Sequence, residues 1–126
     1  NFNGTEEGLT RSAKQDELKT VPEVYSFRQS SSQAFYFVGN ATIQGEALTA
    51  DDIIVAYNGD VIVGSRYWYG EITDVPAMGY DPNNYGKYTE GYCEMGDQVT
   101  FKVLDASTRK LIEMEADGDI RWENKF

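Results

Sequence analysis

Apolar and polar positions follow the two-residue period of β-strands from residue 24 onward. Residues 24–28 alternate, with Tyr25 and Phe27 on one face. Residues 33–38 are apolar on both faces, which predicts a central strand of a sandwich and the middle of its core. The strands predicted from this pattern are 24–28, 33–38, 41–44, 98–104 and 120–124, and Ile112 and Met114 are expected to face inward before the last of them.

The sharpest local signal is a hairpin over residues 52–64. Two β-branched runs are joined there by Asn58-Gly59, a pair that tolerates the positive φ angles of a type I′ turn. A two-residue loop at this pair predicts that Tyr57 lies opposite Asp60, which would fix the register of both strands.

The spacing of these strands predicts an all-β fold. Seven to nine short strands, with no helical period after residue 22, are typical of an antiparallel β-sandwich, Ig-like or jelly-roll-like, and an open barrel is the alternative. Residues 1–22 are polar and lack the strand period. We therefore expect an N-terminal extended arm over 1–22 and a β-sandwich domain over 23–126.

Charge and composition narrow the classes of partner. The chain has 126 residues, 21 acidic against 11 basic, with a formal net charge of −10, which repels phosphate backbones and anionic lipid headgroups. No apolar run approaches the roughly 20 residues of a spanning helix. We expect no nucleic-acid partner and no membrane insertion. Because the first residue is Asn1 rather than Met, we expect that a leader has been removed and that the protein is secreted or lies at the cell surface.

The titratable residues argue against an enzyme. The sequence contains no His, the commonest general base and metal ligand, and Cys93 is the one cysteine, so no internal disulfide is possible. Paired carboxylates could act as acid and nucleophile on a glycoside, but this needs a cleft that a compact sandwich of this size seldom frames. We expect no catalytic activity.

A long segment between predicted strands, Gly70 to Asp97, is rich in Gly, Pro, Asn and Tyr. Connections of this length are either functional or disordered. Ca²⁺ takes six to eight oxygen ligands from carboxylates and carbonyls, which such a loop supplies. The candidate ligands are Asp81, Asn83, Asn84 and Glu90. The spacing matches no defined calcium motif, and a solvated acidic loop is the alternative.

Aromatic residues suggest a second kind of site. Tyr67, Trp68 and Tyr69, joined by Tyr85, could stack on sugar rings while acidic residues bind the hydroxyl groups. On a strand, Trp68 faces away from its two tyrosine neighbours, so one of the two faces is expected to belong to the core. The alternative is that all of them are packing residues of an edge strand.

Several short motifs lie between residues 45 and 107. They are 45–48, the hairpin 51–64 with Asn58-Gly59-Asp60, 73–79 with Val75-Pro76-Ala77-Met78-Gly79, 89–92, and 100–107 with Phe101-Lys102 and Asp105-Ala106-Ser107. With these motifs the chain resembles a family of secreted bacterial β-sandwich modules found in large cell-surface and exported proteins. The resemblance covers about residues 25–116 and implies a sandwich fold, an extracellular location and no catalysis. After Gly79 this chain has Tyr80-Asp81-Pro82 where the family pattern has two consecutive aspartates.

Together these features predict a structural subunit that assembles with other copies of itself into a filament, sheath or surface layer, with Ca²⁺ as a possible stabilising ion. The open edges of a sandwich accept a strand from a neighbour, and the donated segment is expected at 21–27 or 120–126. The residues predicted to mediate assembly are Val21, Val24, Tyr25 and Phe27. The alternative is a carbohydrate-binding module of a secreted bacterial protein that binds an extracellular glycan.

Overall fold

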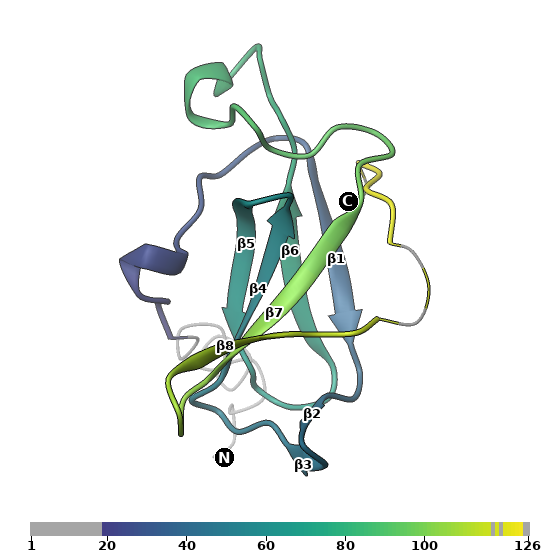
Figure 1. Ribbon diagram of the computed structural model, residues 1–126. Coiled ribbons are helices and arrows are strands. Elements are labelled where there is room, and N and C mark those ends of the chain that lie inside the picture. The colour runs from purple at the N-terminus through teal and green to yellow at the C-terminus, as the bar shows by residue number, and fades with distance from the viewer. Residues whose placement is uncertain (1–18, 117, 119, 125–126) are drawn as a thin grey trace, which may run out of the picture.

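The computed structural model describes residues 19–116, 118 and 120–124 and is all-β, as the sequence predicts. Its strands pack as an antiparallel β-sandwich (Figure 1). The elements are the 3₁₀ turn η1 (Glu23–Tyr25), the strands β1 (Gln33–Val38), β2 (Thr42–Ile43), β3 (Glu46–Ala47), β4 (Ile53–Asn58), β5 (Val61–Tyr67) and β6 (Thr73–Met78), the 3₁₀ turn η2 (Gly86–Tyr88), and the strands β7 (Val99–Asp105) and β8 (Lys110–Glu113). No helix in these described ranges is long and apolar enough to cross a membrane.

The larger layer is a four-stranded sheet in the order β5-β4-β7-β8, and β4 is one of its two inner strands. Ile54 and Ala56 of β4 face the main core between the layers. Ile53, Val55 and Tyr57 point to the opposite face, where they form a second buried cluster. Strand β4 is therefore covered on both faces, which is the position that the sequence pattern assigned to residues 33–38.

The smaller layer contains only β1 and β6, paired antiparallel. The bounds predicted for residues 33–38 are confirmed, but the central position is wrong, because β1 pairs with β6 alone among the described strands. Ala34 is buried, whereas Phe37 is 73% exposed. A run that is apolar on both faces fits a central strand and also an edge strand with an uncovered face, and periodicity does not separate the two.

Strand β6 lies inside the segment 70–97 that was predicted to be irregular, and this prediction is wrong. Thr73, Val75 and Ala77 are each 0% exposed and face the core. The strand was missed because of Pro76, since a proline normally argues against a strand. It is tolerated where the position of the absent N–H faces away from the bonded neighbour. The connection after β6, residues 79–98, is irregular as expected apart from the turn η2 and isolated bridges at Gly79, Cys93 and Gln98.

Strands β5 and β6 run side by side where the two layers meet (Figure 1). At the crossing a Cβ atom on Gly64 would lie 1.6 Å from the carbonyl oxygen of Pro76, so only glycine fits there. Arg66 of β5 completes the junction: its Nε donates to the carbonyl oxygen of Asp74 at 2.9 Å and its Nη2 lies 3.2 Å from the Asp74 carboxylate.

The hairpin is confirmed, but its turn lies one residue later than predicted, and Tyr57 pairs with Ile62, two residues beyond the predicted Asp60. The turn is formed by Gly59-Asp60 and the first pairs are Asn58 with Val61 and Tyr57 with Ile62. The register shifts again between Ala56 and Tyr57, because a bulge places one extra residue on β5. Asn58 therefore ends a strand and is not part of the turn.

Two other predicted strands are wrong. Residues 24–28 contain the end of η1 instead, since the amide of Tyr25 donates to the carbonyl oxygen of Pro22 at 2.9 Å. Residues 120–124 form one isolated bridge, between Arg121 and Gln98. Trp122 is nevertheless buried, and its indole N–H donates to the carbonyl oxygen of Ala77 at 2.9 Å.

The other predicted segments agree more closely with the structure. The strand predicted over 98–104 is β7, with Val99, Phe101 and Val103 buried as expected. The segment 41–44 shortens to β2, which pairs with β3. Ile112 and Met114 both pack against the main core.

Replacing Gly64 with Ala is expected to lower the free energy of unfolding by at least about 3 kcal/mol, since the added carbon meets backbone that cannot move aside. Gly39→Ala is the matched control: a Cβ there meets nothing within 4 Å, and the change is expected to stay within about 1 kcal/mol. Urea denaturation measures both. Equal stabilities of the two variants would contradict the close approach at this crossing.

Candidate functional site

Asp81, the first predicted calcium ligand, is a buried hydrogen-bond acceptor. It is 5% exposed, and its Oδ2 accepts bonds from the amide of Ser31 at 2.8 Å and from the Ser31 hydroxyl at 2.5 Å. Its Oδ1 accepts a bond from the side-chain amide of Asn84 at 3.3 Å. The bonds from Ser31 in particular hold the pKa of Asp81 below its usual value. Asp81 thus ties the loop 79–98 to the segment before β1.

Of the four predicted calcium ligands, the structure brings together Asp81 and Asn84 alone. Asn83 and Glu90 are exposed, and the Asn84 amide faces Asp81 with its nitrogen, which is a donor and not a metal ligand. Within 19–116, 118 and 120–124 no three His, Cys, Asp or Glu side chains are grouped so as to hold a metal ion. Calcium binding stays a prediction from the sequence.

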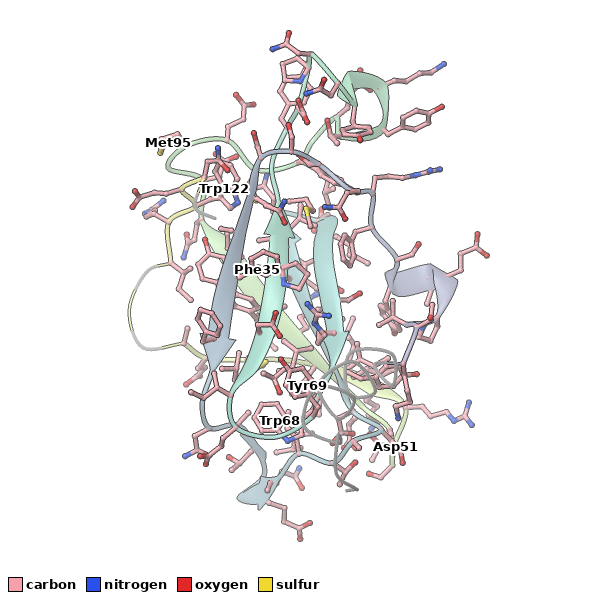
Figure 2. All side chains as sticks on the ribbon, turned by 180° about the vertical axis from the view of Figure 1, so that it is seen from behind. Phe35, Asp51, Trp68, Tyr69, Met95 and Trp122 are labelled. Atoms are coloured by element: carbon pink, nitrogen blue, oxygen red, sulfur yellow. The ribbon has the colours of Figure 1, made fainter. Side chains whose placement is uncertain are left out.

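The predicted aromatic platform is divided between the core and the two ends of the sandwich. Trp68 is 8% exposed and belongs to the main core. Tyr67 packs on the second cluster under the ammonium group of Lys19, and the Tyr69 hydroxyl donates to Asp74. Trp68 and Tyr69 lie at the β2–β3 end (Figure 2), whereas the loop containing Tyr85 lies at the opposite end (Figure 1). These four side chains do not form one surface.

Three tyrosines of the loop 79–98 are exposed. Tyr80, Tyr85 and Tyr88 expose 37%, 43% and 57% of their surface. The guanidinium group of Arg28 lies 4.8 Å from the centre of the Tyr88 ring. The richness of this loop in tyrosine is the signal that identifies the group, of which only Tyr85 was predicted as a ligand-binding residue.

Three of the four residues predicted for assembly pack on their own domain. Val21 and Tyr25 cover the second cluster, on the outer face of the larger sheet, and Phe27 packs against the main core. The hydroxyl of Ser65 donates to the carbonyl oxygen of Tyr25 at 2.6 Å, which fixes this segment. Val24 is 69% exposed.

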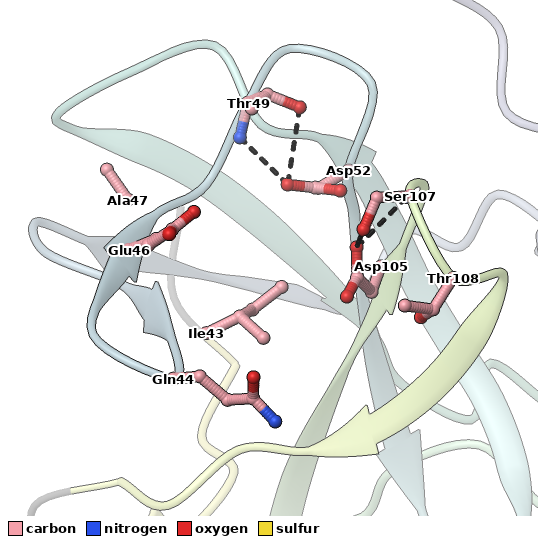
Figure 3. Close-up of a pocket in the computed structure, with 9 residues that line it drawn as sticks. All are labelled: Ile43, Gln44, Glu46, Ala47, Thr49, Asp52, Asp105, Ser107 and Thr108. Atoms are coloured by element: carbon pink, nitrogen blue, oxygen red, sulfur yellow. Dashed lines mark hydrogen bonds between the residues drawn. The ribbon is translucent and has the colours of Figure 1, made fainter.

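A polar pocket of about 290 Å³ lies between the β2–β3 hairpin and the β7–β8 turn (Figure 3). The Asp52 carboxylate in its wall accepts bonds from the amides of Thr49 and Ala106, both at 2.8 Å. The Asp105 carboxylate accepts from the hydroxyl and amide of Ser107, which hold the pKa of Asp105 below its usual value. Both carboxylates stabilise the turns that carry them, so the pocket is explained by turn structure.

The outer edge of β1 is not paired with any described strand. The amide of Gly79 donates to the carbonyl oxygen of Ser32 at 2.7 Å, which continues the β1–β6 ladder. Bonded and non-bonded pairs alternate along an antiparallel ladder. Ala34, Tyr36 and Val38 therefore bond to β6, whereas Gln33, Phe35 and Phe37 direct their N–H and C=O groups outward.

One of these outward groups has a partner. The amide of Gln33 donates to the side chain of Asn124 at 2.8 Å. For Phe35 and Phe37 the described ranges contain no strand on this side. Two residues of β1 thus present an unpaired edge with an exposed phenylalanine.

A groove of about 410 Å³ runs beside this edge, between residues 36–40 and the segment that follows β8. Tyr36 and Phe101 meet edge to face within it, with ring centres 5.7 Å apart. The Tyr36 hydroxyl is buried and has no hydrogen-bond partner among the described atoms, and burial raises its pKa to about 12. The other residues that line the groove are Phe37, Val38, Gly39, Asn40, Met114, Glu115, Ala116 and Ile120.

A charge pattern in the sequence could have identified this edge. Residues 29–45 contain no Asp, Glu, Lys or Arg in a chain of net charge −10. Natural edge strands usually carry a lysine, a proline or a bulge that prevents pairing with another chain, and β1 reads Gln-Ala-Phe-Tyr-Phe-Val. The strand therefore has neither the charge nor the proline that commonly protects an edge strand from pairing with another chain.

Comparison with models of known protein families, with curated proteins and with solved structures gave no match. The resemblance to secreted bacterial β-sandwich modules therefore stays a prediction from the sequence motifs.

Replacing Asp81 with Asn is expected to lower the free energy of unfolding at pH 7, because the Ser31 donors lose a charged acceptor. The folded pKa of Asp81 is lowered, so its contribution is complete above the unfolded value and is lost as the pH falls through the folded one. The stability difference from wild type should therefore shrink below about pH 4. Glu90→Gln removes an exposed charge from the same loop and is expected to change the free energy of unfolding little. Urea titrations at several pH values measure both variants. Equal losses of stability in the two would contradict the stabilising role of Asp81.

Proposed function

We propose that this chain is a non-catalytic structural domain that assembles with other copies of itself by strand addition at the free edge of β1. The observation that carries the proposal is the unpaired backbone of Phe35 and Phe37 beside an open groove. Strand addition supplies both missing partners: the added backbone bonds to the edge, and its side chains enter the groove.

The charge distribution permits a second copy of the chain to approach at this edge. Two copies that each carry a net charge of −10 repel one another. Repulsion is weakest where neither surface carries charge, and residues 29–45 provide such a surface around β1. Phe37, with 73% of its surface exposed, would be covered by the added strand.

The proposed setting is extracellular, in a filament, sheath or surface layer. The motif resemblance to secreted modules supports this setting. Calcium is not needed for strand addition, and a stabilising Ca²⁺ ion is left as an additional hypothesis for the loop 79–98.

Phe37→Lys is expected to prevent self-association, since it places a charge on the edge and removes the exposed ring. Met95→Lys is the matched control, because Met95 is 71% exposed, lies on the loop 79–98 and gives the same change of net charge. Sedimentation velocity over a range of concentrations, with electron microscopy of the larger species, measures both. Loss of association in the Met95 variant as well, or a wild-type chain that stays monomeric throughout, would contradict the proposal.

A second candidate function, glycan binding, is supported by the exposed tyrosines of the loop 79–98. Tyr80, Tyr85 and Tyr88 offer aromatic surface in the same loop as the exposed side chains of Asn83 and Glu90. Aromatic and polar side chains together bind sugar rings and their hydroxyl groups. A glycan array tests this function with the wild type, Tyr88→Ala and Phe37→Lys. Glycan binding is favoured over assembly if the wild type and Phe37→Lys bind a glycan and Tyr88→Ala does not.

A further inference from the structure

We propose that the strand added to β1 is the segment 8–15 of a neighbouring copy, which contains two basic residues and no acidic one. This inference rests on the proposed function and names the donor.

The donor segments predicted from the sequence are occupied in their own domain. Val21 and Tyr25 cover the outer face of the larger sheet. Trp122 is 4% exposed and bonded through its indole to Ala77, so the segment around it is part of the core. Lys19 marks where the arm joins the domain: its ammonium donates to the carbonyl oxygen of Ala50 at 2.7 Å and pairs with Asp51 at 3.2 Å. The chain before Lys19 remains as a donor.

That chain is long enough for the task. Eighteen residues precede Lys19, and extended chain spans up to about 3.3 Å per residue. The acceptor strand β1 has six residues, about 20 Å of strand. A neighbour can therefore keep its own Lys19 in place and still lay a full strand along β1.

Charge selects the part of the arm that fits. Residues 8–15 contain Arg11 and Lys14 and no acidic residue, although Glu7 and Asp16 border the segment. On the acceptor side, β1 is uncharged and Glu115 lines the groove. The negative charge of Glu123 also reaches this region, since it contributes to the raised pKa of Tyr36. A basic strand beside a neutral strand with carboxylates at its flank is a complementary pair.

The side chains of this segment alternate in a way that suits the groove. In an extended conformation Leu9, Arg11 and Ala13 share one face, and Thr10, Ser12 and Lys14 share the other. With the first face turned inward, Leu9 and Ala13 would enter the apolar part of the groove and Arg11 would pair with Glu115. Each copy then donates at one site and accepts at another, a heterologous contact that extends into open polymers.

Mixing two variants of the full chain tests the donor. Arg11→Glu/Lys14→Glu has an altered donor and an intact acceptor, whereas Phe37→Pro has an intact donor and an altered acceptor. The proline removes an N–H that faces outward, so the β1–β6 ladder is kept. Each variant alone is expected to associate at least tenfold more weakly than wild type. A mixture of the two is expected to form one-to-one dimers that do not grow, as measured by sedimentation velocity and light scattering.

Lys87→Glu/Lys110→Glu is the charge-matched control, since both lysines are exposed and the net charge changes equally. Urea denaturation confirms that each variant folds, and Phe37→Lys replaces Phe37→Pro if the proline variant does not. If assembly is lost in the Phe37 variant but kept in Arg11→Glu/Lys14→Glu, the segment 8–15 is not the donor. Strand addition at β1 would still be supported in that case. A wild type that never associates would overturn both.

Discussion

The close crossing of Gly64 and Pro76 is the constraint on which the rest of the architecture depends. Glycine lets β5 pass directly over the carbonyl of Pro76, and the proline has no N–H with which β6 could bond to β5. The ladder alternation directs this missing donor away from β1, toward β5. The sheet therefore divides there into two layers. Strand β6 keeps one bonded neighbour, β1, and β1 becomes the outer strand of a two-stranded layer.

The exposed edge follows from that division. A two-stranded layer can bury one face against the larger sheet, as Ala34, Val75 and Ala77 do, but its outer strand has no further partner. The segment after β8 lies beside β1 without pairing along it, so that a groove remains between them. In this account the groove and the unpaired backbone are two consequences of one junction, and the proposed assembly would complete the smaller layer.

The two-residue period predicted the all-β fold, because it records which side chains face a core. It located 33–38 and 98–104 almost to the residue. It did not show which strand is central, since Phe35 and Phe37 look the same in sequence whether a sheet covers them or not. Because of Pro76, β6 was not predicted as a strand. A proline is tolerated in a strand when the side that lacks the N–H is not bonded, and the sequence alone does not show which side of a strand is bonded.

The candidate sites were harder to predict for the same reason. The sequence located the acidic, tyrosine-rich loop but not the fact that Asp81 is already bonded to Ser31, fifty positions away in the chain. Trp68 was expected to face away from its tyrosine neighbours, and it does, into the core. The free edge is carried by backbone groups, which no residue pattern reports directly. Only the uncharged stretch 29–45 pointed toward it.

Amide hydrogen exchange along β1 tests the central claim most directly. In dilute solution the amides of Phe35 and Phe37 should exchange quickly, while those of Tyr36 and Val38, bonded to β6, should exchange slowly. At concentrations where copies assemble, the first pair should become as protected as the second. Phe35 and Phe37 amides that are protected in the dilute chain, or that stay unprotected in the assembled one, would contradict the account.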